Sequence, residues 1–590
     1  MNNKKKLIIG IVLGIILVSG ITYAILTWTS TRINLGITSD CFTIDYTKGG
    51  DITGSLKLLN EEDLITNDNK FTIKNGVGIS SANIGINSNC NIEGYGRLLL
   101  NVTSISSAFT TGDSVGSLKY VVLKNTSSIT NPSDVSVTSL LNQSFDIEAK
   151  GSITSSGTKD ILVRNLSNTE IYKYLIVIYI DNNLAGNDVI GATFTGTISA
   201  DATQGTLNAD YTLQKLNSLN STITVDTSHT PDFTTVSGNN GVKVDNNTRT
   251  ETSGQGDGTN GIYVSEDDFG TSYYFRGAVE NNYVKFGKYS NDLYFITDNA
   301  TFYSTGTSCQ SGYTCIKLGS AGDNIYWRII RINGDGTVRM IYAGTSPYDN
   351  GYKDSDYNTT IGYSQYNINN DDNTYVGYMY GTAGASTYAE THANTNNSII
   401  KTLIDTWYQN NLSIYSYAIA DAIYCNDRNP VSLPAFGLTG TGVGTEYTAY
   451  ADASRNWLSH NPSLKCTNAN DRFTVNESNG NGALTYPVGL ITTDEVSFAG
   501  AVAGDIVNNT YIKNSAYYLY NMREYWTMTA DAYGPINTST PEAFVGVVDD
   551  VGFLGSRRVN GDYGARPVVS LNSDAISGGS GTMTDPFTAD

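Results

Sequence analysis

The sequence predicts a mainly β protein with a few helices, attached to a membrane by an N-terminal transmembrane helix. Three observations lead to this fold class. No charged side chain occurs from Leu7 to Trp28, short apolar segments alternate with polar turns over most of the chain, and helical periodicity is confined to a few short stretches. The 590 residues divide into a stub and anchor (1–30), a β-sandwich (31–204), a polar linker (205–262) and an α+β domain (263–590).

The N-terminal segment follows three lysines and continues without charge from Leu7 to Trp28. As a helix it would extend about 33 Å, enough to cross a hydrocarbon core of about 30 Å. The lysines should remain in the cytoplasm, so that the bulk of the chain lies outside. The alternative is a cleaved signal peptide with Leu7–Val18 as its apolar region and a cleavage site at Thr22–Ala24. Both interpretations export the rest of the chain, and the apolar run beyond Ala24 favours the anchor.

The charge balance excludes one class of partner. The chain has 36 Lys and Arg against 56 Asp and Glu, a net charge of -20. Because so acidic a chain repels phosphate, we expect no nucleic-acid partner. The 59 Gly, 41 Tyr and only 11 Pro are typical of a secreted β protein.

The cysteines indicate an oxidising compartment. Two of the six lie early and four late in the chain, so each region holds an even number. We predict the bonds Cys41–Cys90, Cys309–Cys315 and Cys425–Cys466. Free thiols or a metal site are the alternatives, but no histidine lies near a closely spaced cysteine pair.

Residues 31–204 contain short alternating segments separated by Gly, Asn, Ser and Asp, which is typical of a β-sandwich. The run Tyr174–Ile180 is apolar on both faces and should be a central strand. With the anchor, the segments Tyr172–Asp181 and Gly191–Ile198 resemble TasA/camelysin-type surface domains of Bacillota. That resemblance implies a jelly-roll-like sandwich.

Residues 205–262 lack apolar periodicity and predict a flexible linker, in which only Tyr211–Leu219 could form a helix. Extra strands packed on a neighbouring domain are the alternative. Beyond the linker, Tyr326–Ile332 and Thr337–Tyr342 predict a hairpin around a glycine-containing turn.

Two helices are predicted in the C-terminal region. Ser398–Asn411 has apolar residues at helical spacing (Ile400, Leu403, Ile404 and Trp407), with Asn397 as a plausible N-cap. A second helix should cover Thr492–Ala499.

Several blocks of the C-terminal region occur together in a recognisable order. They are Tyr273–Gly277, Tyr326–Arg331, Ile419–Asp421, Tyr486–Val496, Tyr525–Met528 and Gly564–Leu571. This order resembles an uncharacterised bacterial surface-domain family related to the C-type-lectin-like fold of formylglycine-generating enzymes. The resemblance implies a fold that mostly serves ligand binding. Enzymatic members use cysteine chemistry in the pocket, and that motif cannot be placed on this sequence.

Candidate ligand-binding residues lie near the C-terminal strands. Aromatic rings can stack on sugar C–H groups, which nominates Trp526, Tyr533 and Tyr563. Arg557 and Arg558 could recognise a carboxylate or sulfate. A solvated hairpin carrying two charges is the alternative for the arginines.

Catalytic and metal-binding patterns are weaker. Three scattered histidines (His229, His392 and His460) offer few candidates for a triad, and Asp494/Glu495 and Asp549/Asp550 are expected at the solvated surface. Residues 354–358 begin like a calcium loop, but Thr359 and Gln365 replace the required Gly and Glu. Asn367–Asn373 could supply oxygens in another geometry. We expect no cofactor, with calcium as the one ion that these loops leave open.

The sequence therefore predicts a membrane-anchored bacterial surface protein. Its lectin-like domain should bind an unknown extracellular glycan or protein, in ligand binding or adhesion. The alternatives are an extracellular enzyme that acts on a polysaccharide or protein, and a structural matrix subunit.

Overall fold

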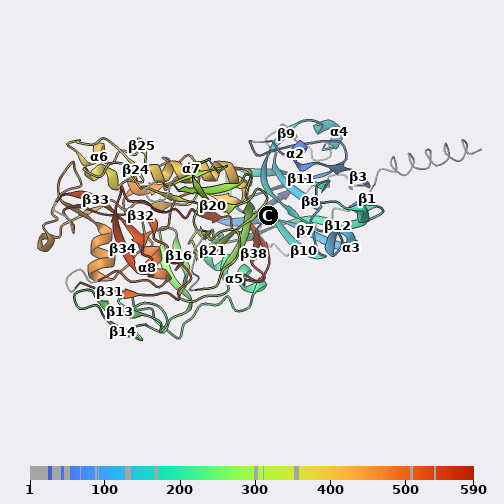
Figure 1. Ribbon diagram of the computed structural model, residues 1–590. Coiled ribbons are helices and arrows are strands. Elements are labelled where there is room, and N and C mark those ends of the chain that lie inside the picture. The colour runs from blue at the N-terminus through green and yellow to red at the C-terminus, as the bar shows by residue number, and fades with distance from the viewer. Residues whose placement is uncertain are drawn as a thin grey trace, which may run out of the picture. The chain divides into compact units, whose positions relative to one another are not determined.

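The structure is a computed structural model of the chain (Figure 1). It describes residues 24–28, 42–45, 53–66, 68–86, 90, 92–125, 135–166, 170–297, 303–309, 311–350, 358–504, 509–536 and 540–589. The chain forms two compact units, Met1–Thr206 and Leu207–Asp590.

Unit 1 is a β-sandwich. Its strands are β1 (Ala24–Trp28), β2 (Phe42–Asp45), β3 (Thr53–Leu56), β4 (Leu58–Leu59), β5 (Lys70–Thr72), β6 (Gly78–Ile86), β7 (Gly94–Ile105), β8 (Leu118–Lys124), β9 (Ser144–Ser152), β10 (Gly157–Leu166), β11 (Ile171–Asp181) and β12 (Thr193–Gln204). Its short helices are α2 (Glu61–Leu64), α3 (Ser107–Thr110), α4 (Val137–Leu140) and η2 (Asn187–Val189). One sheet has the order β10-β7-β12-β1-β3 and the other β2-β6-β11-β8-β9-β5, with β4 paired to β11.

The core of unit 1 lies between the two sheets. Leu98 and Leu100 of β7 and Ile198 of β12 share one cluster with Ile176 and Ile178 of β11, and all five are fully buried. Strand β11 pairs with β6 on one side and β8 on the other. The prediction of a central strand at Tyr174–Ile180 is therefore confirmed.

The end of the predicted membrane segment is a strand. Ala24–Trp28 form β1, which pairs in parallel with β12 and antiparallel with β3. The prediction that the helix extends to Trp28 is wrong, because this part of the chain supplies a strand of the sandwich. Residues 7–23 lie outside the described residues. Among those described, no helix combines the length and apolar character that a membrane crossing requires.

Unit 2 begins with elements that were expected to be a linker: α5 (Ala209–Leu219), β13 (Val242–Asp245) and β14 (Thr250–Ser253). Strand β13 pairs with β14 and with β31 (Thr510–Lys513), more than 250 residues later. The buried side chain of Arg276 donates to Thr235 O and Asp257 Oδ2 of this region and to Ser497 O. The segment is thus part of unit 2, and the flexible-linker prediction is wrong.

Two large sheets form the rest of unit 2. The first sheet has the order β26-β36-β22-β21-β17-β38-β37, and β16 pairs with both β21 and β15. The second sheet has the order β23-β35-β32-β29-β28, and β33 pairs with both β32 and β34. Their strands are β15 (Gly261–Asp267), β16 (Gly270–Arg276), β17 (Tyr283–Lys288), β21 (Asn324–Ile332), β22 (Val338–Tyr342), β23 (Tyr363–Ser364), β26 (Ile419–Ala420), β28 (Pro430–Val431), β29 (Thr448–Tyr450), β32 (Tyr525–Gly534), β33 (Glu542–Val548), β34 (Leu554–Arg558), β35 (Tyr563–Gly564), β36 (Val568–Leu571), β37 (Ile576–Gly578) and β38 (Phe587–Ala589).

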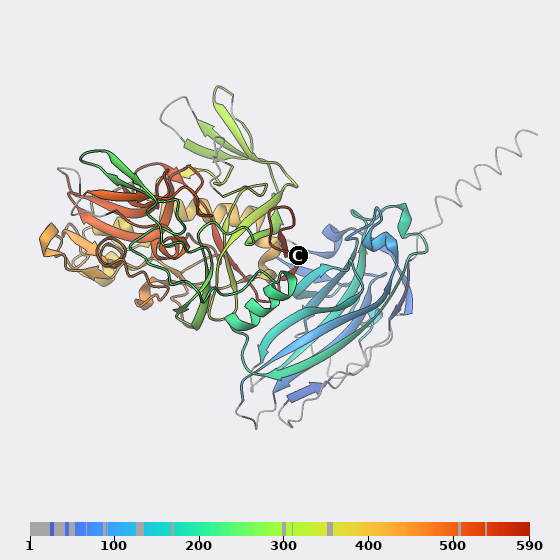
Figure 2. The same cartoon turned by 90° about the horizontal axis from the view of Figure 1, so that it is seen from below.

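Smaller elements surround these sheets. A three-stranded sheet consists of β18 (Leu293–Thr297), β19 (Tyr303–Gly306) and β20 (Thr314–Gly319), and we call it the flap (Figure 2, yellow-green). The short strands are β24 (Met379–Tyr380), β25 (Asn396–Asn397), β27 (Tyr424–Cys425) and β30 (Arg472–Phe473). The helices are α6 (Tyr388–Thr391), α7 (Ile399–Asn411), α8 (Thr493–Ala499), η3 (Asn373–Val376), η4 (Ser413–Ala418), η5 (Pro434–Phe436), η6 (Ala453–Ser459) and η7 (Ala469–Asp471).

The predicted hairpin and helices are present. Strands β21 and β22 pair across a turn in which Gly336 has φ 85°, a conformation that glycine adopts without strain. Helix α7 starts one residue later than expected and is capped by Ser398, whose Oγ accepts from Lys401 N, so the proposed cap Asn397 is wrong. Helix α8 starts with a capping box between Thr492 and Glu495.

Arg276 provides a test of whether residues 205–262 belong to the fold. We expect Arg276→Met to lower the free energy of unfolding of unit 2 by about 3–5 kcal/mol, because it leaves the buried Asp257 unpaired. Urea unfolding of the full chain, followed by tryptophan fluorescence, measures this, since four of the five tryptophans lie in unit 2. The exposed Arg249→Met should change it by less than about 0.5 kcal/mol. Equal effects of the two variants would contradict the structure.

Candidate functional site

Trp526 is fully buried, so its expected surface position is wrong. It lies on β32, every residue of which is buried between neighbouring strands. Its Nε1 donates to Ser364 O at 2.8 Å, and its ring packs edge-on against Tyr366 and Tyr563. The indole therefore supports β23 from within the protein, and neither face of its ring is accessible to a ligand.

The two arginines proposed for ligand recognition already have carboxylate partners. Arg557 pairs with Glu524 and, at 2.7 Å, with Asp549, and it lies 6.0 Å from the Tyr563 ring. Arg558, whose side chain is 50% exposed, pairs with Glu542 at 2.8 Å. Tyr533 is buried and donates to Asp371 O at 2.9 Å. The structure brings Trp526, Arg557 and Tyr563 together, but their polar groups are used within the protein.

The surroundings of two histidines can be compared with those of a catalytic histidine. Ser228 Oγ and Asp226 Oδ2 both contact Nδ1 of His229, at 2.9 and 2.8 Å. A triad requires the nucleophile and the carboxylate on opposite ring nitrogens, so this cluster is not one. Burial, with nearby Arg428, lowers the pKa of His392 well below its ordinary value, and Nε2 contacts Gly442 O.

The loops considered for calcium are held by hydrogen bonds. Residues 354–357 lie outside the described residues. The amide of Asn367 donates to Tyr375 O and Gly377 O, and that of Asn373 donates to Gly444 O and Glu446 O. Within the described residues, no three His, Cys, Asp or Glu side chains lie in a metal-binding arrangement.

A charged cleft surrounds the N-terminus of α8, where Asp494 and Glu495 are buried rather than solvated as predicted. Arg331 Nε and Arg339 Nε lie 3.1 and 2.5 Å from Glu495 Oε1. Burial alone would raise the pKa of Glu495, but the two arginines outweigh it and hold the pKa below its ordinary value. The cavity has a volume of about 30 Å³, room for about two waters. Charged side chains around this cavity pair with one another, and the cavity itself is too small for a ligand.

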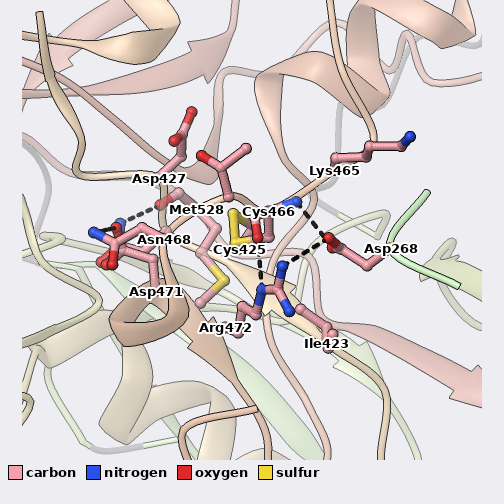
Figure 3. The surroundings of a disulfide bond; sticks show 12 residues. Asp268, Ile423, Cys425, Asp427, Lys465, Cys466, Asn468, Asp471, Arg472 and Met528 are labelled. Carbon is pink, nitrogen blue, oxygen red and sulfur yellow. Dashed lines mark hydrogen bonds and ion pairs between the residues drawn. A yellow bond between two sulfur atoms is a disulfide. The ribbon is translucent and has the colours of Figure 1, made fainter. Parts of the chain in front are cut away.

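One side of this cleft is formed by the Cys425–Cys466 disulfide and by Asp427. Arg472 and Asp268 flank Cys466: Arg472 Nε donates to its carbonyl, and Asp268 Oδ2 accepts from its N–H (Figure 3). Asp427 has φ 52°, an uncommon value for a residue with a Cβ.

The anchors on both sides of Asp427 explain its conformation. Asn426 donates to Met528 O at 2.6 Å, and Arg428 Nε donates to Asp471 Oδ1 at 2.6 Å. Asp427 is thereby turned onto Arg455, and burial raises its pKa to about 6.

A second buried acidic group lies beside the π-helix η6. Asp452, before its first residue, accepts from Asn456 and Thr493 through Oδ1 at 2.6 Å. Burial first, and then the charge of Asp531, raise the pKa of Asp452 to about 8, and burial raises that of Asp531 to about 6. Both groups are fully inside the protein, and the two titrate as a pair.

An open groove lies beside α7, and we call it the α7 groove. It consists of two adjoining hollows of about 400 and 310 Å³ that share Thr305, Leu403 and Thr406 as walls. Helix α7 forms one side, and β23 with the end of β19 forms the other. Volumes of 300–1,000 Å³ are typical of ligand sites.

Aromatic packing holds the flap against the groove, and a disulfide closes the flap on itself. Phe295 of β18 packs on Tyr363 of β23 with ring centroids 5.5 Å apart. The Cys309–Cys315 bond links the segment after β19 to β20. Trp407 and Tyr289 line the deeper hollow and pack edge-on, 6.3 Å apart. The groove therefore combines segments that are about 100 residues apart in the chain.

Sequence reasoning missed these groove residues. Helix α7 itself was predicted, and its exposed Thr402, Thr406 and Asn410 lie at four-residue spacing, the one signal that a polar face existed. Nothing in the sequence shows that the flap would cover that face.

Two predicted disulfides, Cys309–Cys315 and Cys425–Cys466, are confirmed. The predicted Cys41–Cys90 bond lies outside the described residues, because Cys41 is not among them.

Comparisons with protein-family models, with curated proteins and with solved structures found no match in any of the three.

The buried acids predict how the stability of unit 2 depends on pH. A carboxyl whose pKa rises on folding binds its proton more tightly in the folded chain, so the free energy of unfolding falls as pH rises. For Asp427, Asp452 and Asp531 the window runs from the ordinary 3.8 to about 8. We expect the melting temperature, read by tryptophan fluorescence, to fall by about 5 °C from pH 5 to pH 8.

Asp452→Asn should flatten this dependence, because the amide carries no charge at either pH. The exposed Asp371→Asn is the matched control and should leave the slope unchanged. A melting temperature that rises from pH 5 to pH 8 would show that these carboxyls are ionised without cost in the folded chain.

Proposed function

We propose that this chain is a bacterial cell-surface protein, anchored in the cytoplasmic membrane by Leu7–Tyr23, that binds an extracellular ligand through unit 2. The apolar segment that precedes β1 has 17 residues, about 26 Å as a helix and near the lower limit for a span. Lys4–Lys6 would hold the N-terminus in the cytoplasm. The two disulfides of unit 2 favour an oxidising compartment outside it.

The finer fold assignments belong to the same proposal. We assign unit 1 to a jelly-roll-like sandwich of the TasA/camelysin type, supported by its two packed sheets. We assign unit 2 to the C-type-lectin-like class. In support, the block Tyr326–Arg331 lies in β21, and Gly564–Leu571 extends into β36, which pairs with β22 beside it.

The α7 groove is the observation that carries the binding role. It is open to solvent and within the size range of ligand sites. Among the described residues that line it, Asp292 is the one carboxylate, and it pairs with Lys317 at 2.8 Å. Glycoside hydrolysis typically uses two carboxyl groups that flank the bond, so the described lining favours binding of a saccharide over its hydrolysis.

Expression of the full chain on bacterial cells tests this function. Brief trypsin treatment of intact cells should release peptides of unit 2, because the proposal places it outside. The cells should also adhere to at least one surface coated with a wall polysaccharide, a mucin-type glycoprotein or a matrix protein. The control is the chain with Leu403→Arg. Leu403 lines both hollows, so the larger arginine should fill them and abolish adhesion.

Release of unit 2 peptides only after cell lysis would overturn the proposed location. Adhesion that is equal with and without Leu403→Arg would overturn the proposed role of the groove. Turnover of a coated polymer by the full chain would support the alternative, an extracellular enzyme.

A further inference from the structure

We infer that the ligand of the α7 groove is an uncharged oligosaccharide, bound without a metal ion. This inference rests on the proposed function and specifies the chemistry of its ligand. It follows from what lines the groove, how those groups are already bonded, and where charge is absent.

The lining consists of hydroxyls, amides and apolar surface. Thr402, Thr406 and Asn410 project from the exposed face of α7, and Ile399 and Leu403 of the same helix also line the hollows. A pyranose ring offers the complementary pattern, because its equatorial hydroxyls donate and accept at the rim while its C–H groups form an apolar face. Tyr363, half-buried at the opposite wall, adds an aromatic surface for such a face.

The hydrogen-bonding state of α7 leaves acceptors available. Thr406 Oγ1 donates to Thr402 O at 2.7 Å, and Thr402 Oγ1 donates to Ser398 O at 3.0 Å. Each hydroxyl proton is thus used within the helix, while the oxygen lone pairs remain to accept from a ligand hydroxyl.

Asparagine side chains supply the donors. Within the described residues, the exposed amides of Asn397 and Asn410 make no hydrogen bond to the protein. Each carries two N–H donors and one carbonyl acceptor. The groove therefore presents donors at its ends and acceptors along α7, as an oligomer of alcohols requires.

The charges disfavour ionic ligands. Asp292 pairs with Lys317 at 2.8 Å and also accepts from Ala321 N at 2.9 Å, so its charge is matched within the protein. Among the described residues that line the two hollows there is no arginine or lysine to receive a carboxylate, sulfate or phosphate, and the chain carries -20 overall. A polyanion would lose its hydration there without gaining a counter-charge.

Oligosaccharides of related sugar rings but different charge provide the test. Calorimetry with the detergent-solubilised full chain would compare N-acetylchitooligosaccharide with its deacetylated, cationic form, and galactose oligomers with oligogalacturonate. Mannose and glucose oligomers complete the neutral set. At least one neutral oligomer should bind at least tenfold more tightly than any charged one, with equal affinity in excess EDTA.

Three variants locate the binding. Leu403→Arg should weaken it at least tenfold, whereas Gln409→Arg, which adds the same charge to the same helix away from the lining, should change it less than twofold. Thr406→Val removes a hydroxyl at nearly constant volume and should weaken it threefold or more. Unchanged melting temperatures show that the variants remain folded.

The outcomes separate this inference from the proposed function. If only charged oligomers bind and Leu403→Arg abolishes that binding, the groove binds ligand but its chemistry is not as inferred. If neutral oligomers bind equally to all variants, or lose affinity in EDTA, the inferred site is wrong. If no probe binds while cells still adhere in a manner sensitive to Leu403→Arg, the surface role stands and the saccharide is excluded.

Discussion

Arg331 and Arg339 lie directly opposite each other on β21 and β22, and their guanidinium groups converge on the carboxylate of Glu495. Two like charges in register inside a sheet are unfavourable unless a counter-charge lies between them. Glu495 supplies it from α8, where it also closes the capping box with Thr492. The position of α8 on the large sheet is therefore fixed by an electrostatic requirement as well as by packing.

Much of the remaining architecture follows from that docking. With α8 in place, Asp494 pairs with Arg455 of the π-helix, and Arg455 reaches Asp427 beside the second disulfide. The main-chain oxygens at the end of α8 accept from Arg276, which joins residues 205–262 to unit 2. A chain in which only 16% of residues are charged thus uses many of its charges in the interior.

This distribution of charge separates structural from functional surface. The cleft beside α8 has paired charges and little free volume, whereas the α7 groove has free volume and, among its described lining residues, one carboxylate that is already paired. The residues chosen from sequence have a structural role. Trp526 and Arg557 support neighbouring strands, and their polar groups are already bonded within the protein. Trp526 nonetheless acts on the groove indirectly, because its indole N–H holds β23 in place.

The sequence by itself determined the features that depend on local pattern: the β class, the central strand β11, the β21–β22 hairpin, helices α7 and α8, and the pairing of the four late cysteines. Each follows from alternation, helical spacing, a turn glycine or, for the cysteines, an even number in one region whose members lie nearest each other in the chain. Only the tertiary structure decided that residues 205–262 are folded, that Ala24–Trp28 form a strand, and that Trp526 is buried. It also decided that Thr305 meets Thr406 across a groove. These depend on which faces pack together over long separations in the chain, and the free energy of that packing is not encoded in any local segment.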